Sequence, residues 1–61
     1  MGKKYKVEQN GQFLGHWSAH TPQEAIKKAI TNYGLYYNID PKGEFDIVYG
    51  RKEFHILGEE Q

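Results

Sequence analysis

The tetrapeptide Thr21-Pro22-Gln23-Glu24 marks the start of a helix and constrains the fold more than any other feature of the chain. Threonine as N-cap, proline at the first helical position and glutamate at the third form a capping box with a pre-set first turn. Apolar residues then recur on one stripe through Tyr33, which predicts a helix of about 12 residues. We expect Gly34 to end it in the left-handed conformation.

The residues before this helix alternate as in a two-stranded hairpin. Apolar side chains stand at every second position over residues 5–8 and 12–19, and Asn10-Gly11 between them is a strong hairpin signal. A two-residue loop at Asn10-Gly11 would pair Val7 with Leu14, whereas a three-residue loop starting at Gln9 would pair Val7 with Phe13. We predict the three-residue loop, because it places all the large odd-numbered side chains on one face.

The residues after the helix predict a second hairpin. Residues 45–49 and 53–56 alternate around Gly50-Arg51, which suits a two-residue turn with glycine first. That register pairs Ile47 with Phe54 and Asp46 with His55. Residues 40–43, Asp-Pro-Lys-Gly, predict a turn, and residues 58–61 are expected to be a frayed tail. For residues 35–39 the sequence leaves three alternatives: a short strand, a loop or a continuation of the helix.

These elements predict an α+β fold with two layers, in one domain spanning residues 1–61. Hairpin, helix and hairpin give a mostly antiparallel sheet of about four strands with one helix packed on one face. A single helix cannot cover both faces of such a sheet, so the other face is expected to be open. The predicted core comprises Tyr5, Val7, Phe13, Trp17, Ala25, Ile26, Ala29, Ile30, Tyr33, Phe45, Ile47, Tyr49, Phe54 and Ile56.

Composition narrows the classes of function. The net charge is zero, which argues against a strong nucleic-acid binder. Residues 1–33 carry five basic and two acidic side chains, whereas residues 34–61 carry three basic and six acidic ones. The chain has no cysteine and no apolar run of about 18 residues, which favours a cytoplasmic location over a secreted or membrane-spanning one.

Two sets of polar residues are candidate chemical sites. His16 and His20 are four apart, but strand residues at that spacing lie about 13 Å apart, too far to share one metal ion. The predicted register brings Asp46 opposite His55, which resembles part of a hydrolytic triad, with Ser18 as the one hydroxyl on that face. No nucleophile motif accompanies them, so we predict no catalytic residue, no cofactor and no metal site.

We therefore expect a small non-catalytic interaction module, a regulatory accessory protein that binds a protein partner or another copy of itself. Two surfaces are candidates: the open sheet face and the loop after the helix. The residues assigned to them are Lys4, Lys6, Leu14, His16, Val48 and His55 on the sheet, and Tyr36 and Tyr37 on the loop. The alternative is weak nucleic-acid binding through the N-terminal lysines and the exposed tyrosines. We expect no membrane partner and no small-molecule substrate.

The stretch TPQEAIKKAI resembles the T-x-E-E-A helix start of many small prokaryotic domains, including HicB-type antitoxins. It covers about ten residues and follows from the capping box, so it implies no function. The small size of the chain, rather than this resemblance, leads us to expect a phage or prokaryotic source.

Overall fold

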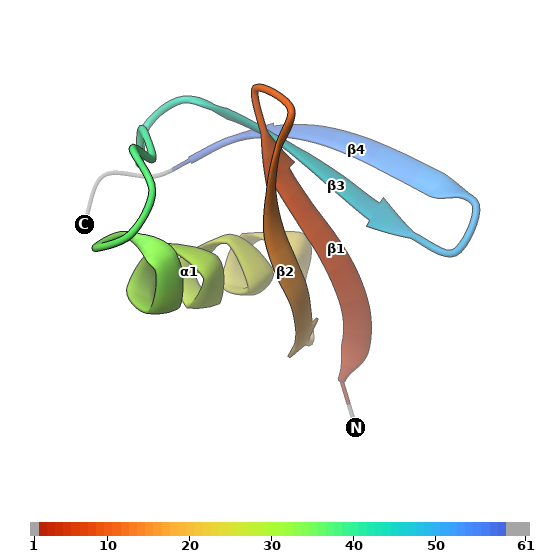
Figure 1. Cartoon of the computed structure of the whole chain (residues 1–61). Coiled ribbons are helices and arrows are strands. Elements are labelled where there is room, and N and C mark those ends of the chain that lie inside the picture. Colours follow the sequence, from red (N-terminus) through yellow and green to blue (C-terminus); the bar gives the residue numbers. More distant parts are fainter. Residues whose placement is uncertain (1, 59–61) are drawn as a thin grey trace.

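Two hairpins form one antiparallel sheet, and a single helix lies between them in the chain (Figure 1). The computed structural model describes residues 2–58. The elements are β1 (Lys3–Gln9), β2 (Gln12–Ala19), α1 (Pro22–Tyr33), β3 (Glu44–Tyr49) and β4 (Lys52–Leu57). The strands stand in the order β2-β1-β3-β4. The predicted α+β class and the hairpin–helix–hairpin order are confirmed.

The helix packs beneath one half of the sheet. It crosses β2 and β1, whereas the β3–β4 hairpin extends beyond it (Figure 1). The buried side chains come from α1 and from the sheet face that it covers: Tyr5, Val7, Leu14, Ala19, Ala25, Ile26, Ala29, Phe45 and Ile47. Trp17, Ile30, Tyr33, Ile39, Phe54 and Ile56 pack against them while partly exposed. Within residues 2–58, no helix lies on the opposite face of the sheet.

The helix begins at the predicted capping box, except that Glu24 accepts from the N–H one residue before the N-cap. The Thr21 hydroxyl accepts a hydrogen bond from the Glu24 N–H at 3.2 Å, and the Glu24 carboxylate accepts one from the His20 N–H at 2.7 Å. Pro22 occupies the first helical position. Two N–H groups at the helix start are thereby satisfied by side chains.

The helix ends at Tyr33 with the predicted length of 12 residues, but the predicted left-handed conformation of Gly34 was wrong. Gly34 has φ −62° and ψ −22°, which is right-handed backbone, and its N–H donates to the Ile30 carbonyl. The N–H groups of Tyr36 and Tyr37 both donate to the Tyr33 carbonyl at 3.0 Å. The chain therefore makes one further helix-like turn, which satisfies the Tyr33 carbonyl without a left-handed glycine. Residues 35–39 form a turn and loop, and no strand.

The predicted register of the first hairpin was also wrong. Gln9 pairs with Gln12 across a two-residue loop, and Asn10 and Gly11 have φ values of 51° and 81°. Positive φ at both central residues is the requirement of a type I′ turn, which Asn-Gly meets at low cost. In this register Leu14 lies on the helix side and is fully buried, whereas Phe13 is on the open side and 45% exposed.

A β-bulge explains why the odd-numbered pattern misled the prediction. The pairing shifts between Lys6 and Glu8, so that Leu14 and Gly15 together lie opposite Val7. Beyond the bulge Tyr5 pairs with Trp17, and the odd-numbered side chains return to the helix side. The two-residue register therefore holds next to the turn. Beyond the bulge the odd-numbered side chains face the helix, as expected for the three-residue loop, but their strand partners differ from those it predicts.

The second hairpin has the predicted register. Ile47 pairs with Phe54 and Asp46 with His55, and Gly50 in the turn has φ 61°. One prediction here was wrong: Tyr49 is exposed rather than in the core, because it lies near the tip of the hairpin, beyond the end of the helix. The Tyr49 ring instead contacts the Tyr5 ring, at 5.3 Å between centroids. The expected tail at 58–61 lies mostly outside the described residues, but Gly58 donates an N–H to the Gly43 carbonyl.

Candidate partner-binding surfaces

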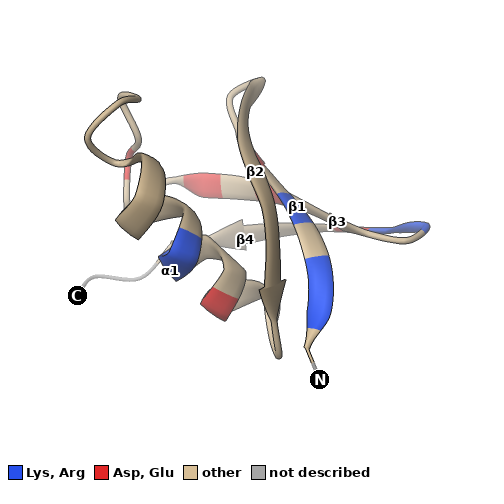
Figure 2. Ribbon diagram, turned by 60° about the horizontal axis from the view of Figure 1, so that its bottom comes forward, with Lys and Arg blue, Asp and Glu red and all other residues tan. Residues whose placement is uncertain are grey.

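The loop between α1 and β3 presents two large side chains to solvent. Leu35 is 94% exposed and Tyr36 is 79% exposed. They lie within residues 29–39, a stretch that contains no Lys, Arg, Asp or Glu. Figure 2 shows this uncharged stretch in tan, from the last turns of α1 to the segment before Asp40. Of the two predicted loop residues, Tyr36 projects fully, whereas Tyr37 is 38% exposed and partly packed.

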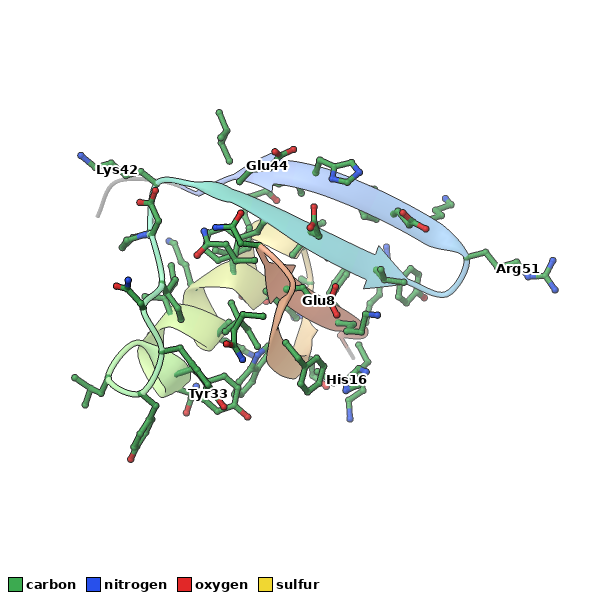
Figure 3. All side chains as sticks on the ribbon, turned by 45° about the horizontal axis from the view of Figure 1, so that its top comes forward. Glu8, His16, Tyr33, Lys42, Glu44 and Arg51 are labelled. Carbon is green, nitrogen blue, oxygen red and sulfur yellow. The ribbon has the colours of Figure 1, made fainter. Side chains whose placement is uncertain are left out.

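Aromatic contacts hold the helix side of this loop. The Tyr33 ring, at the end of α1 (Figure 3), meets the Tyr37 ring edge to face with centroids 5.4 Å apart. On its other side Tyr33 meets Trp17, with centroids 5.7 Å apart. The Trp17 N–H in turn donates to the Leu14 carbonyl at 2.6 Å. A chain of packed rings thus connects the loop to the buried part of β2.

A buried amide holds the other end of the loop. The Gln9 side chain donates from Nε2 to the Asp40 carbonyl and accepts at Oε1 from the Asp40 N–H, both at 2.9 Å. Asp40 also begins the predicted turn, with its carbonyl accepting from the Gly43 N–H. Both ends of the loop are therefore fixed, and Leu35 and Tyr36 project from an ordered segment.

The open sheet face carries most of the predicted sheet residues. Lys4, Lys6, His16, Val48 and His55 lie on it, as the register implies. Leu14 does not: it is fully buried against the helix side, because the two-residue turn and the bulge invert its orientation. Phe13 takes its place on this face, and its ring contacts the His16 ring at 5.3 Å. Leu57, 69% exposed, is a third apolar side chain on this face beside Phe13 and Val48.

Charges of both signs are interleaved across this face. One row across the four strands consists of Phe13, Glu8, Asp46 and His55. The next row consists of His16, Lys6, Val48 and Glu53. Lys6 and Glu8 come within 3.7 Å of each other on the same strand. The open face is therefore a mixed polar surface, on which charged residues separate the apolar side chains Phe13 and Val48.

The structure brings together Asp46 and His55 but not Ser18. His55 Nδ1 lies 2.7 Å from Asp46 Oδ1, as the register predicts. Ser18 lies on β2, at the opposite edge of the sheet from β4, three strand spacings or about 14 Å away. Its carbonyl accepts a hydrogen bond from the Lys28 ammonium. His16 and His20 also stay apart, one within β2 and one just before the N-cap Thr21.

The N-terminal lysines and the loop tyrosines lie at opposite ends of the helix. Lys3 pairs with Ala19, just before α1 begins, whereas Tyr36 follows the end of α1. A helix of 12 residues is about 18 Å long. Among residues 2–58, one ammonium group lies over an aromatic ring: Lys3 Nζ is 5.6 Å from the centroid of the Tyr49 ring.

Leu35 is the surface residue that sequence reasoning missed. It is one of residues 35–39, for which the sequence leaves a strand, a loop and a continuation of the helix open. The uncharged run of residues 29–39 marks this part of the chain in the sequence, but it includes the buried Ala29 and does not tell which of its members are exposed. No protein-family model, curated protein or solved structure matches this chain significantly. No helix among the described residues has the length and apolar character needed to cross a bilayer.

Proposed function

We propose that this chain is a small non-catalytic interaction module that binds a separate protein through the Leu35–Tyr36 tip of the loop after the helix. The observation that carries the proposal is the exposure of these neighbouring side chains, 94% and 79%, on a segment fixed at both ends. Tyrosine is enriched among the residues that supply most of the energy of protein interfaces, and the neighbouring leucine adds apolar area that excludes water.

The shape and charge of the tip indicate the kind of partner surface to which it is complementary. A projecting pair of apolar side chains with no charge between residues 29 and 39 is complementary to an uncharged, concave recess. Fixing the loop before binding lowers the entropy cost of association. A cytoplasmic regulatory accessory protein, acting by occupying a recess on a larger protein, is the role that fits these properties.

Nucleic-acid binding is the less favoured alternative. Binding to phosphates requires lysine or arginine beside the stacking rings, and residues 29–39 contain neither. The N-terminal lysines lie at the far end of the helix from Tyr36. Nucleic-acid binding would weaken steeply with added salt, whereas binding through an apolar tip would not.

A photo-reactive amino acid at position 36 tests the proposal. We expect it to cross-link one defined protein in cells of the source, and the same group at position 13, on the open sheet face, to give no such product. The captured protein is then purified and titrated with the unmodified chain. Leu35→Ala and Tyr36→Ala are each expected to cost about 1–3 kcal/mol of binding free energy, in the range of interface hot spots.

Phe13→Ala and Leu57→Ala are matched controls, because both remove exposed apolar side chains elsewhere. They should leave the affinity unchanged. Equal losses at positions 13 and 35 would contradict the assignment to the loop. Sedimentation that shows a dimer broken by Leu35→Ala would replace the separate partner by a second copy.

A further inference from the structure

We infer that Glu44, Asp46 and His55 form a binding site for a divalent transition-metal ion of the zinc class. The three side chains project from β3 and β4 on the open sheet face, and one donor atom of each lies within 4.8 Å of the others. Figure 3 shows Glu44 on the side of β3 that faces away from the helix. This site is separate from the Leu35–Tyr36 tip and does not depend on the proposed function.

The strand register fixes two of the three donors. Tyr49 and Lys52 flank the two-residue turn and therefore form a hydrogen-bonded pair. Such pairs alternate along an antiparallel ladder, so Asp46 and His55 form a non-hydrogen-bonded pair, in which side chains stand closest. Their positions result from backbone pairing and need no rearrangement of the chain.

The distances between the donor atoms match those of a metal site. His55 Nδ1 lies 2.7 Å from Asp46 Oδ1 and 3.8 Å from Glu44 Oε2. Ligands at about 2.0–2.2 Å in a tetrahedral zinc site stand roughly 3.4 Å from one another. The two observed distances bracket this value, so small side-chain rotations bring the three donors onto one ion. The fourth position faces solvent.

The charges at the site favour a cation. Among the described residues, Glu44 and Asp46 share His55 as their ion-pair partner. Two carboxylates that face a single imidazole have at most one positive charge between them. A divalent ion in place of the imidazole proton would neutralise both carboxylates. One nitrogen and two oxygen donors suit zinc, whereas magnesium prefers oxygen donors and water.

Zinc titration of the chelator-treated protein tests the inference. We expect Zn²⁺ to bind with a stoichiometry near one, measured by calorimetry, and to shift the backbone amide resonances of Glu44, Asp46 and His55. His55→Ala and Asp46→Asn should each weaken Zn²⁺ binding by about tenfold or more. His16→Ala is the matched control, because it removes an exposed histidine from the same face, and it should leave the affinity unchanged.

Three results would overturn the site. The first is no Zn²⁺ binding by the folded chain. The second is binding that survives His55→Ala, or that His16→Ala weakens equally. The third is Mg²⁺ binding as tight as Zn²⁺ binding, which would reduce the site to a pair of carboxylates. Since these side chains are exposed or only partly buried, the variants are expected to fold, and an amide spectrum of each confirms this.

Discussion

The side chain of Gln9 and the main chain of Asp40 form a pair of hydrogen bonds, each 2.9 Å long, across 31 positions of sequence. Gln9 is the one buried polar residue among those described, at 5% exposure. Its amide satisfies the Asp40 N–H, which lies in a loop that has no strand partner. This contact fixes the second end of the loop that carries Leu35 and Tyr36.

Gln9→Ala is expected to lower the free energy of unfolding by about 1–3 kcal/mol, because it leaves the Asp40 N–H without its partner. Urea denaturation measures the change. Gln12→Ala removes an exposed amide from the adjacent strand and should change stability by less than about 0.5 kcal/mol. Equal effects of the two substitutions would show that the Gln9 contact contributes little.

The register of the first hairpin predicts losses of stability of very different size for two neighbouring residues. Leu14→Ala creates a cavity in the core and should cost about 2–5 kcal/mol, whereas Phe13→Ala removes a side chain from the open face and should cost much less. Where Leu14→Ala does not fold, Leu14→Val gives a measurable intermediate loss. A lower denaturant midpoint for Phe13→Ala than for Leu14→Ala would instead support the register of the three-residue loop.

Gly15 at the bulge has φ +98°, and an added Cβ would lie 2.9 Å from Trp17 Nε1. Gly15→Ala is therefore expected to destabilise the fold by about 1–3 kcal/mol, through backbone strain and displacement of the indole. Gly11→Ala is a useful comparison, because Gly11 also has positive φ but open space around it. Its loss in thermal or urea unfolding should be smaller than that of Gly15→Ala.

Glu24 gives the helix start a pH dependence. The hydrogen bond from the His20 N–H lowers the pKa of the Glu24 carboxyl below the ordinary glutamate value. Because the folded pKa is the lower one, the stabilisation is present above the unfolded pKa and is lost as pH falls through the folded pKa. The stability difference between the wild type and Glu24→Gln should therefore shrink on acidification from neutral pH through that window. A difference that stays constant with pH would contradict this account.

Much of the fold follows from local chemistry in the sequence. The capping box fixes the start of the helix, and Gly50-Arg51 fixes a hairpin whose alternation agrees with its turn. In the first hairpin the turn chemistry of Asn10-Gly11 conflicts with the odd-numbered alternation. In the structure a β-bulge at Gly15 resolves this conflict. A prediction that assumes one register for the whole hairpin leaves no place for such a bulge.

The candidate sites were predictable to different degrees. The Asp46–His55 contact follows directly from strand register, and Glu44 lies two positions from Asp46 on the same face. Leu35 was not predictable as an exposed residue. Its orientation depends on the extra turn after Tyr33 and on the bonds from Gln9 to Asp40, and the latter is a contact between residues far apart in sequence.

The central claim, that the Leu35–Tyr36 tip is the binding surface, is tested most directly by amide chemical shifts of the labelled chain titrated with its purified partner. We predict the largest chemical-shift changes at residues 33–38 and small changes on the open sheet face. Changes centred on Lys6, His16 and Val48, with the resonances of Leu35 and Tyr36 unmoved, would contradict it.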